Sequence, residues 1–292
     1  MGNWGIPYMG SKSDIIKSIA LNFPKSENFY DLFGGGFCVT HYMLQEKPHW
    51  YKHFHYNEIK SDIVELVKNA INGDFSYNEF KPEWISREDF LARKDTDAYV
   101  RCLWSFGNNQ RDYLFREEIE PYKKSLHMAV VFDEFDDTAR DVLKISKWPD
   151  KISNIKDRRL YLRQRIKYDK PHLRPTELEQ LERLEQLQQI ERLQRLSFSS
   201  LSYEQVDIKP NSVVYCDIPY KGTTGYSDTF DHKPFFDWAA TREFPVFISE
   251  YNVPDPRFKR IYSVAKTVKM SSQGATKESA DPSREKLYWN GK

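Results

Sequence analysis

The sequence predicts an α/β protein with a Rossmann-like, mostly parallel sheet that carries helices on both faces. Residues 30–33 have strand character and precede a helical pattern at 38–45. The same order recurs in residues 53–57 and 61–69. Strands that alternate with helices in this way are typical of a parallel sheet covered by helices.

Local features account for each of these elements in turn. Isoleucines at helical spacing predict a first helix in residues 11–21. Residues 30–33 run directly into three glycines, and the stretch that follows them is amphipathic. Residues 53–57 form a short aromatic strand pattern, and 61–69 carry apolar residues at helical spacing.

The late part of the chain returns to the same pattern. Further strands are expected at 212–216, 246–249 and 286–289, and residues 271–285 have the composition of a mobile loop. The middle of the chain has a different composition, with an acidic cluster at 133–137, a basic stretch at 157–174 and a leucine repeat. We therefore expect one α/β domain made of residues 1–70 and 200–292, interrupted by an inserted, mainly helical region at 71–199.

A leucine tract at the end of this insertion has a period of three residues. On an α-helix a three-residue step turns about 300°, so successive leucines move around the helix instead of forming a stripe. A two-stranded coiled coil needs an average spacing of about 3.5. We expect a helix held by neighbours on several sides; a leucine zipper is the less favoured alternative. The tract comprises Leu178, Leu181, Leu184, Leu187, Ile190, Leu193 and Leu196.

Composition excludes several classes of protein. The 292 residues include 44 basic and 43 acidic ones, a net charge of +1, so the chain does not coat nucleic acid through bulk charge. A role in binding nucleic acid would therefore require a local patch of basic residues. We expect no membrane span and no signal peptide, and the three widely spaced cysteines suit a reducing, cytoplasmic setting. His53 and His55 have no third partner nearby in sequence, so no metal site is expected.

Three short segments have the residues that a ligand site needs. Gly34-Gly35-Gly36 lies between a strand and a helix, where backbone can approach a ligand closely, although a tight turn without a ligand also fits. No nucleotide-binding glycine motif of the GxGxxG or GxxxxGK[ST] type occurs.

Asp217-Ile218-Pro219-Tyr220 follows a strand, where ligands of α/β sheets bind. An acceptor carboxylate, a backbone carbonyl and an aromatic ring suit a planar base with an exocyclic amine; an Asp-Pro turn with a core tyrosine is the alternative. The third segment, Tyr8-Met9-Gly10-Ser11-Lys12, could by itself be only a helix cap.

Together these segments resemble the DNA adenine N6-methyltransferases of bacteria and phages, in the group that orders its motifs as here. The family's aromatic-x-Gly-x-Lys segment is similar to residues 8–12, its Phe-x-Gly-x-Gly turn to residues 33–37, and its Asp-Pro-Pro-Tyr loop to residues 217–220. Phage members also carry segments similar to 105–109 and to the leucine tract. The resemblance covers most of the chain.

The resemblance implies roles for particular residues. Asp217, Ile218, Pro219 and Tyr220 would form the catalytic loop that holds the target adenine. The acid after the second strand, Glu58, would accept the cofactor's ribose hydroxyls, and the pair Ser202-Tyr203, shortly upstream of the catalytic loop, would bracket its adenine. The residues so assigned to S-adenosylmethionine are Tyr8, Gly10, Lys12, Asp31, Phe33, Gly34, Gly35, Gly36, Glu58, Ser202, Tyr203 and Asp217.

Three positions depart from the family pattern. Phe37 replaces the last glycine of the turn, which would tighten the cofactor pocket. Ile218 replaces the first proline of the catalytic loop, where the backbone carbonyl is the group that matters. Ser202 stands where an acid often binds the cofactor's adenine amine, and its hydroxyl would bind more weakly.

Two segments of the insertion are candidates for double-stranded DNA. Residues 157–174 hold seven basic and two acidic residues, a net charge of +5, and would contact phosphates, unless they pair with the acids at 133–137. A loop rich in amides would read base edges, unless it is merely a polar hairpin tip. The expected DNA-binding residues are Asn108, Asn109, Gln110, Arg111, Arg158, Arg159, Arg163, Arg165 and Lys167.

The sequence thus predicts an S-adenosylmethionine-dependent DNA adenine N6-methyltransferase that flips its target base and acts as a monomer or weak dimer. Asp217 and the Ile218 carbonyl would accept the amine hydrogens, and Tyr220 would stack on the flipped ring. Two alternatives stay open. One is the same chemistry on RNA or a protein amide, and the other is a DNA-binding module with this fold but no turnover.

Overall fold

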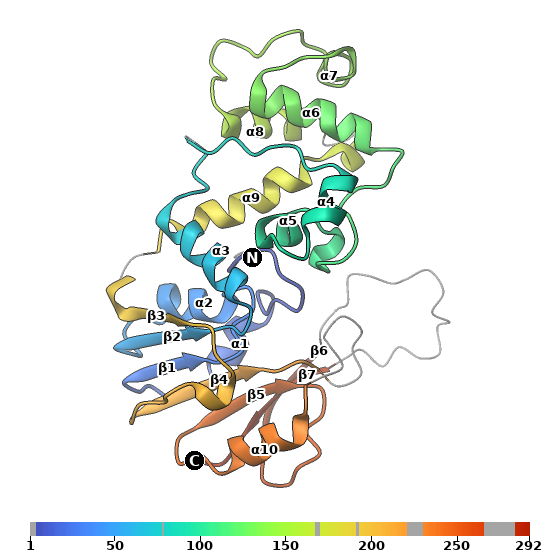
Figure 1. The fold of residues 1–292 in the computed structure, drawn as a ribbon. Coiled ribbons are helices and arrows are strands. Elements are labelled where there is room, and N and C mark those ends of the chain that lie inside the picture. Colours follow the sequence, from blue (N-terminus) through green and yellow to red (C-terminus); the bar gives the residue numbers. More distant parts are fainter. Residues whose placement is uncertain (1–3, 78, 167–169, 191–192, 221–229, 266–283) are drawn as a thin grey trace. The chain divides into compact units, whose positions relative to one another are not determined.

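The computed structural model describes residues 4–77, 79–166, 170–190, 193–220, 230–265 and 284–292 (Figure 1). Its contacts divide the chain into two compact units, one of residues 1–4, 11–64 and 191–292, the other of residues 5–10 and 65–190. The first unit contains the sheet and the second is built from helices. Lys167, one of the expected DNA contacts, and most of the 271–285 loop lie outside the described residues.

The sheet of the first unit has seven strands in the order β3-β2-β1-β4-β5-β7-β6. Neighbours from β3 to β5 are parallel, whereas β7 is antiparallel to both β5 and β6. This order reverses direction between β1 and β4, as in doubly wound nucleotide-binding folds. The strands are β1 (Asn28–Asp31), β2 (His53–Asn57), β3 (Leu196–Ser199), β4 (Ser212–Asp217), β5 (Val246–Glu250), β6 (Lys259–Ala265) and β7 (Arg284–Trp289).

Helices cover both faces of this sheet (Figure 1). On one face, α1 (Ile16–Ala20) leads to Phe23, whose ring packs on Phe29, Tyr215 and Phe247 of three neighbouring strands. The helices α2 (Cys38–Glu46) and α3 (Ser61–Asn72) follow β1 and β2. On the other face, α10 (His232–Ala240) joins the buried cluster formed by alternate residues of β1, β4 and β5. The predicted Rossmann-like α/β fold is therefore confirmed.

Two strands were not predicted, and the first helix is shorter than expected. The strand β3 is only four residues long and begins at the last residue of the polar leucine tract, and β6 carries Lys259 and Arg260, so neither shows a clear apolar pattern. The helix α1 begins at Ile16 instead of residue 11. Before it, the Ser13 hydroxyl hydrogen bonds to Ser11 Oγ and to the Trp4 carbonyl. Such side-chain bonds compete with helix formation.

In the second unit the described elements are helical, apart from an isolated bridge between Ser105 and Tyr113. Side-chain caps fix four of the described helix starts in this unit, at Ser86, Asp97, Asp136 and Asn154. The elements are α4 (Arg87–Arg93), α5 (Ala98–Leu103), α6 (Glu120–Phe132), α7 (Asp137–Leu143), α8 (Ile155–Ile166) and α9 (Thr176–Leu187), with 3-10 turns at Phe106–Asn108 and Pro171–Leu173.

The leucine tract is not one helix, contrary to expectation. Leu178, Leu181, Leu184 and Leu187 lie in α9 and are almost completely buried, so neighbours do contact this helix on several sides. The helix ends at Leu187, however, and Leu193 lies in a separate 3-10 turn. Leu196 is the first residue of β3. Sheet pairing with β2 overrides the helix propensity at this end of the tract.

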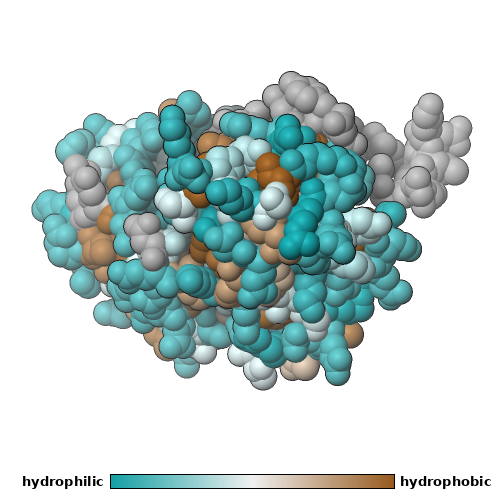
Figure 2. Space-filling model, turned by 90° about the horizontal axis from the view of Figure 1, so that it is seen from above, coloured by the Kyte–Doolittle hydropathy of each residue, from teal (hydrophilic) through white to brown (hydrophobic). Residues whose placement is uncertain are grey.

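The face shown in Figure 2 is mainly polar. Figure 2 shows hydrophilic residues over most of the face it presents, with hydrophobic residues only in small, separate patches. In the part of the chain that the structure describes, no helix is both long and apolar enough to cross a membrane. Among the same residues, no group of three or more His, Cys, Asp or Glu is arranged to hold a metal ion.

Candidate active site

Two acidic residues end neighbouring strands at the point where the strand order reverses. Asp31 is the last residue of β1 and Asp217 the last of β4. The two strands are parallel, and Asp31 pairs in register with Tyr215, so both carboxylates lie at the same edge of the sheet. Ligands of open α/β sheets bind at this edge, beside the reversal in strand order. The fold therefore places both predicted acids where a ligand site is expected.

The glycine turn after β1 is held tightly against β2. The Gly34 amide donates to the Asn57 carbonyl at 2.8 Å, and the Tyr56 hydroxyl donates to the Gly35 carbonyl at 2.6 Å. A Cβ atom on Gly34 would lie 2.3 Å from the Tyr56 ring. Only glycine fits at this position, because the buried Tyr56 ring fills the space that a side chain needs.

Phe37 ends this turn in the left-handed conformation, with φ 66°. That conformation costs a non-glycine residue about 1–2 kcal/mol, which explains why the related motif has glycine here. The Phe37 ring is completely buried and contacts Tyr56 and His41. The free energy gained by burying the Phe37 ring offsets the cost of its left-handed backbone conformation.

Glu58, just after β2, is a buried carboxylate tied to the glycine turn. Its two oxygens accept hydrogen bonds from the Gly35 amide at 3.0 Å and the Lys60 amide at 3.1 Å. Burial raises the pKa of the Glu58 carboxyl, and these amide donors act in the opposite direction. Glu58 thus links the turn after β1 to the end of β2.

Asp31 has one satisfied and one unsatisfied carboxylate oxygen. Its Oδ2 atom accepts hydrogen bonds from the Thr40 amide and hydroxyl, at 3.2 and 2.8 Å. Its Oδ1 atom is buried and has no hydrogen-bond partner in the described structure. Burial, and to a smaller extent the nearby Asp217 carboxylate, raise the pKa of Asp31 to about 7. A buried acceptor left unsatisfied is costly, so Oδ1 is suited to a ligand donor or cation.

An aromatic cluster lies beside the glycine turn. The Phe33 ring stacks on Tyr203 with centroids 5.8 Å apart, and both contact Phe235 of α10. Ser202 caps the short turn that contains Tyr203 through a reciprocal contact with Gln205. Phe33 and Tyr203 are each partly exposed, which leaves apolar ring surface accessible to a ligand.

The predicted catalytic loop contains a network of charged groups around one lysine. Lys12 Nζ lies 2.7 Å from Asp217 Oδ1 and 3.6 Å from Glu285 Oε1, with the Lys12 and Glu285 side chains almost fully buried. The same ammonium lies 4.9 Å from the centre of the Tyr220 ring, and the Tyr220 hydroxyl donates to Glu285. Burial and the two carboxylates hold the pKa of Tyr220 far above its usual range, so its phenol stays neutral.

The middle of the loop is anchored at two positions. The Ile218 side chain is 2% exposed and belongs to the core cluster beneath α10. Next to it, the Pro219 carbonyl accepts a hydrogen bond from His232 Nε2 at 2.8 Å. Core packing of Ile218 thus fixes a position where the related motif has proline.

A sequence model of the D12 class of N6 adenine-specific DNA methyltransferases matches residues 8–253. The chain belongs to this family. The expected enzyme class, an adenine-specific DNA methyltransferase, is therefore confirmed. A search of curated protein sequences finds no match. Among solved structures, the chain is similar to the rRNA methyltransferase AviRa from Streptomyces viridochromogenes, at 11% identity and a TM-score of 0.35, covering 98% of this chain and 87% of that one.

Two of the methyltransferase's expected cofactor residues belong to the helical unit. Tyr8 and Gly10 fall in residues 5–10, which cluster with 65–190, whereas Lys12 belongs to the sheet unit. Gly10 has φ 79°, a conformation that favours glycine. The other expected cofactor residues, from Asp31 to Asp217, lie in the sheet unit.

The amide-rich loop of the methyltransferase is a strained turn between the bridged residues Ser105 and Tyr113. Asn108 and Gln110 both have positive φ. Asn109 braces the turn by accepting from the amides of Arg111 and Asp112, each at 2.9 Å. Arg111 is exposed and paired with Asp112. The side chain of Phe106, in the same turn, is 50% exposed, unusual for a residue of this type.

The arginines expected to contact phosphates differ in accessibility. Arg158 pairs with Asp133 of the acidic cluster at 3.2 Å, and the buried Arg159 pairs with Glu182 at 2.6 Å. Arg163 and Arg165 are exposed; Arg163 lies 3.8 Å from Glu179, and Arg165 Nε donates to the Leu143 carbonyl. The two exposed arginines are the ones best placed to meet a ligand.

Sequence reasoning did not identify four residues that contact the site. Thr40 binds Asp31, Glu285 binds Lys12 and Tyr220, His232 binds the Pro219 carbonyl, and the Tyr251 ring lies edge-on to Tyr220 at 4.6 Å. Thr40 lies three residues beyond the glycine turn, in the first turn of α2, so the sequence could have suggested that its hydroxyl bonds to a group near the helix start. The other three come from distant segments without a local motif.

Proposed function

We propose that this enzyme transfers a methyl group from S-adenosylmethionine to the N6 amine of adenine in double-stranded DNA, after flipping the base out of the helix. The observation that carries the proposal is the arrangement at the ends of β1 and β4. There the buried Asp31 has an oxygen without a hydrogen-bond partner among the described residues. The Lys12 ammonium contacts both the partly exposed Asp217 and the Tyr220 ring. One acid suits a cationic ligand, and the other suits a substrate amine.

The described residues fit S-adenosylmethionine. The unsatisfied Asp31 Oδ1 atom would accept from the cofactor's ammonium, and its burial would make that interaction strong. Glu58 lies at the turn and would accept from ribose hydroxyls, with Gly35 holding its carboxylate. Phe33 and Tyr203 offer ring surface to an adenine. When bound, the cofactor supplies an electrophilic methyl group.

The catalytic loop would orient and activate the target amine. The lone pair of an aromatic amine is delocalised into the ring, so the nitrogen is a poor nucleophile. Asp217 and the Ile218 carbonyl would accept its two hydrogens and favour a pyramidal nitrogen, and Asp217 would stabilise the positive charge that develops there. Tyr220 would hold the flipped base by stacking, worth roughly 1–3 kcal/mol. The excess proton leaves the nitrogen afterwards through Asp217.

The helical unit would supply the contacts to DNA. Asn108, Asn109, Gln110 and Arg111 would approach base edges, and the exposed arginines of α8 would meet phosphates. Phe106 adds an exposed apolar ring to the same turn. Apolar wedges of this kind insert between base steps and open the stack.

The experiment that tests this function is methyl transfer from labelled S-adenosylmethionine into a random-sequence duplex DNA pool, with RNA and protein in parallel. We expect label in duplex DNA only, and single-molecule sequencing of the product should map N6-methyladenine. Label found only in RNA or only in protein would show that the substrate is that polymer and not DNA. Cofactor binding without any methylated product would show a binding module without turnover.

A further inference from the structure

The catalytic loop is held from outside the motif by a side chain of α10. His232 Nε2 hydrogen bonds to the Pro219 carbonyl oxygen at 2.8 Å. Since a carbonyl oxygen only accepts, the ring nitrogen is the donor and carries a proton. Pro219 connects Ile218, whose carbonyl is a proposed acceptor, with Tyr220, the proposed stacking ring.

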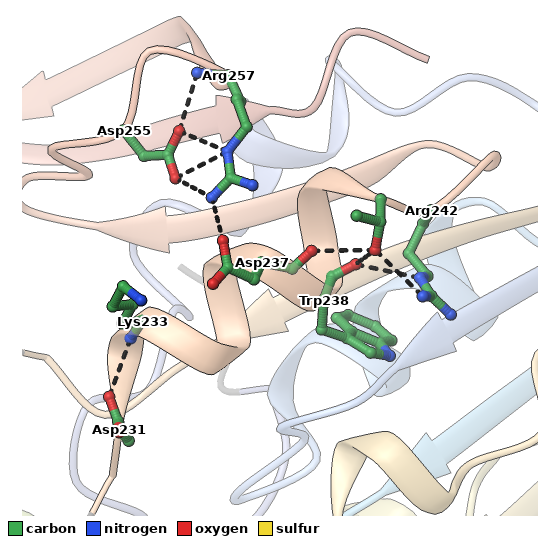
Figure 3. Close-up of polar contacts among 8 residues, drawn as sticks. Asp231, Lys233, Asp237, Trp238, Arg242, Asp255 and Arg257 are labelled. Carbon is green, nitrogen blue, oxygen red and sulfur yellow. Dashed lines mark hydrogen bonds and ion pairs between the residues drawn. The ribbon is translucent and has the colours of Figure 1, made fainter.

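The helix that carries His232 is fixed at both ends (Figure 3). At its start, the Asp231 side chain caps the helix by accepting from the Lys233 amide at 3.1 Å. Midway, Asp237 pairs at 2.6 Å with Arg257, which also binds Asp255 in the segment before β6. At its end, Arg242 donates to the Trp238 carbonyl. A rigid helix can place its first side chain with little freedom.

The surroundings of His232 also restrict its ring. Phe230 packs edge-on against it with centroids 5.0 Å apart, and Phe236 lies at 6.1 Å. Glu250, the last residue of β5, places a carboxylate oxygen 3.8 Å from the same nitrogen and is 2% exposed. The imidazole is therefore held between an aromatic wall, a buried acid and the loop carbonyl, and its own side chain is 20% exposed.

We propose that His232 is a positioning residue for methyl transfer. By holding the Pro219 carbonyl toward α10, it fixes the peptide between Pro219 and Tyr220. The Tyr220 ring and the Ile218 carbonyl are thereby set in the geometry that the target amine requires. The inference rests on the proposed function, because it assigns His232 to the same catalytic loop.

The physical reason is the sensitivity of group transfer to alignment. A displacement of about 1 Å at a reacting group can cost about 100-fold in rate. The two residues that flank Pro219 are already anchored, Ile218 by the core and Tyr220 by Glu285. The His232 bond fixes the carbonyl between them, so its loss leaves the loop in place and frees one peptide plane.

The test compares His232→Ala with His232→Gln, whose side-chain amide keeps a donor close to the position of Nε2. We expect His232→Ala to lower kcat for DNA methylation by about 10- to 100-fold, with the Kd for S-adenosylmethionine and the melting temperature little changed. His232→Gln should recover most of kcat. Lys233→Ala is the matched control, since this neighbouring side chain is exposed and has no contact with the loop among the described residues.

The outcomes separate this inference from the function it rests on. If the wild-type enzyme methylates DNA and His232→Ala does so at the same rate, His232 has no positioning role. Equal losses in the Ala and Gln variants, together with a lower melting temperature, would assign His232 a purely structural role and overturn the inference. Absence of DNA methylation by the wild type would instead overturn the proposed function.

Discussion

Lys12 Nζ lies 2.7 Å from Asp217 Oδ1, so the lysine of the N-terminal segment is an ion-pair partner of the predicted catalytic acid. The Lys12 side chain is 3% exposed, and its ammonium also faces Glu285. One cation thus lies between two carboxylates and orients the Asp217 side chain. The resemblance had assigned Lys12 to cofactor contact; the geometry adds an ion pair with Asp217, the acid proposed to receive the amine.

Replacing Lys12 by methionine is expected to lower the free energy of unfolding by about 3–5 kcal/mol, because two carboxylates lose their buried partner. Methylation should fall with it. Lys52→Met is the matched control: Lys52 pairs with Glu27 on the surface, with 73% of its side chain exposed, and should cost less than about 1 kcal/mol. Denaturant unfolding of both variants measures the difference. Equal losses would show that the Lys12 network contributes no more than a surface pair.

The position of the proposed catalytic motif at the end of a strand could be predicted from sequence, but the residues that contact it from elsewhere in the chain could not. Asp217 and Tyr220 follow an apolar strand and lie together in the chain, so local pattern was enough. Glu285 reaches the same network only because β7 is inserted antiparallel between β5 and β6. His232 meets Pro219 through the packing of α10 on the sheet. Contacts made by tertiary packing leave no local spacing to detect.

Binding of S-adenosylmethionine should strengthen as pH rises from 6 to 8. Burial raises the pKa of Asp31 to about 7, so the carboxyl is mostly protonated at pH 6 and mostly ionised at pH 8. Only the ionised form pairs with a cationic ligand, which predicts up to about a tenfold gain in affinity over this range. Calorimetric titration of wild type and Asp31→Asn at both pH values measures it, and the variant should bind weakly with little pH dependence. An equal pH dependence in the variant would exclude Asp31 as its source.

The same group affects stability in the opposite direction. Because the folded-state pKa of Asp31 lies above its ordinary value, the unliganded folded state binds the proton more tightly than the unfolded state. The stabilisation that Asp31 gives the folded state through this tighter proton binding is fully present below about pH 4 and is lost as pH rises through about 7. Asp31→Asn should reduce the fall in melting temperature across this window. A wild-type profile that Asp31→Asn leaves unchanged would contradict this assignment.

Gly34→Ala should displace the turn and weaken cofactor binding. Its Cβ would lie 2.3 Å from the Tyr56 ring, which is fully buried, so the expected loss of stability is about 1–3 kcal/mol. Gly291→Ala is a control for backbone strain, since Gly291 has φ 82° and no atom near its missing Cβ. That control should bind cofactor normally. Thermal shift with and without S-adenosylmethionine compares them, and normal binding by Gly34→Ala would show that the turn tolerates the displacement.

Phe106→Ala should reduce methylation of fully paired DNA more than methylation of a mismatched adenine. Flipping a mismatched base costs less, so an inserted ring contributes less there. We expect a loss of about tenfold on paired DNA and a smaller one on the mismatch. Leu91→Ala removes another exposed apolar side chain of the helical unit, 56% exposed in α4, and should have no effect. The same loss on both substrates would argue against a role of Phe106 in opening the stack.

Fold prediction failed where tertiary pairing overrides local preference. Leu196–Ser199 begins at the last residue of a polar leucine tract of high helix propensity, yet it pairs with β2 as the edge strand of the sheet. The strands β1, β2, β4, β5 and β7 were found because each contains a short apolar or aromatic run, and the glycines after β1 and Asp217-Ile218-Pro219 at the end of β4 mark where two of these runs stop. A four-residue edge strand lacks such a signal, since only one neighbour contributes to its pairing.

The most direct test of the proposed role of Asp217 is methyl transfer by Asp217→Asn on duplex DNA, alongside its affinity for S-adenosylmethionine. We expect methylation to fall by about 100-fold or more, since the amide cannot stabilise the developing positive charge, while the cofactor Kd stays close to that of the wild type. Methylation by this variant at the wild-type rate would contradict the assignment of Asp217 as the group that receives the adenine amine.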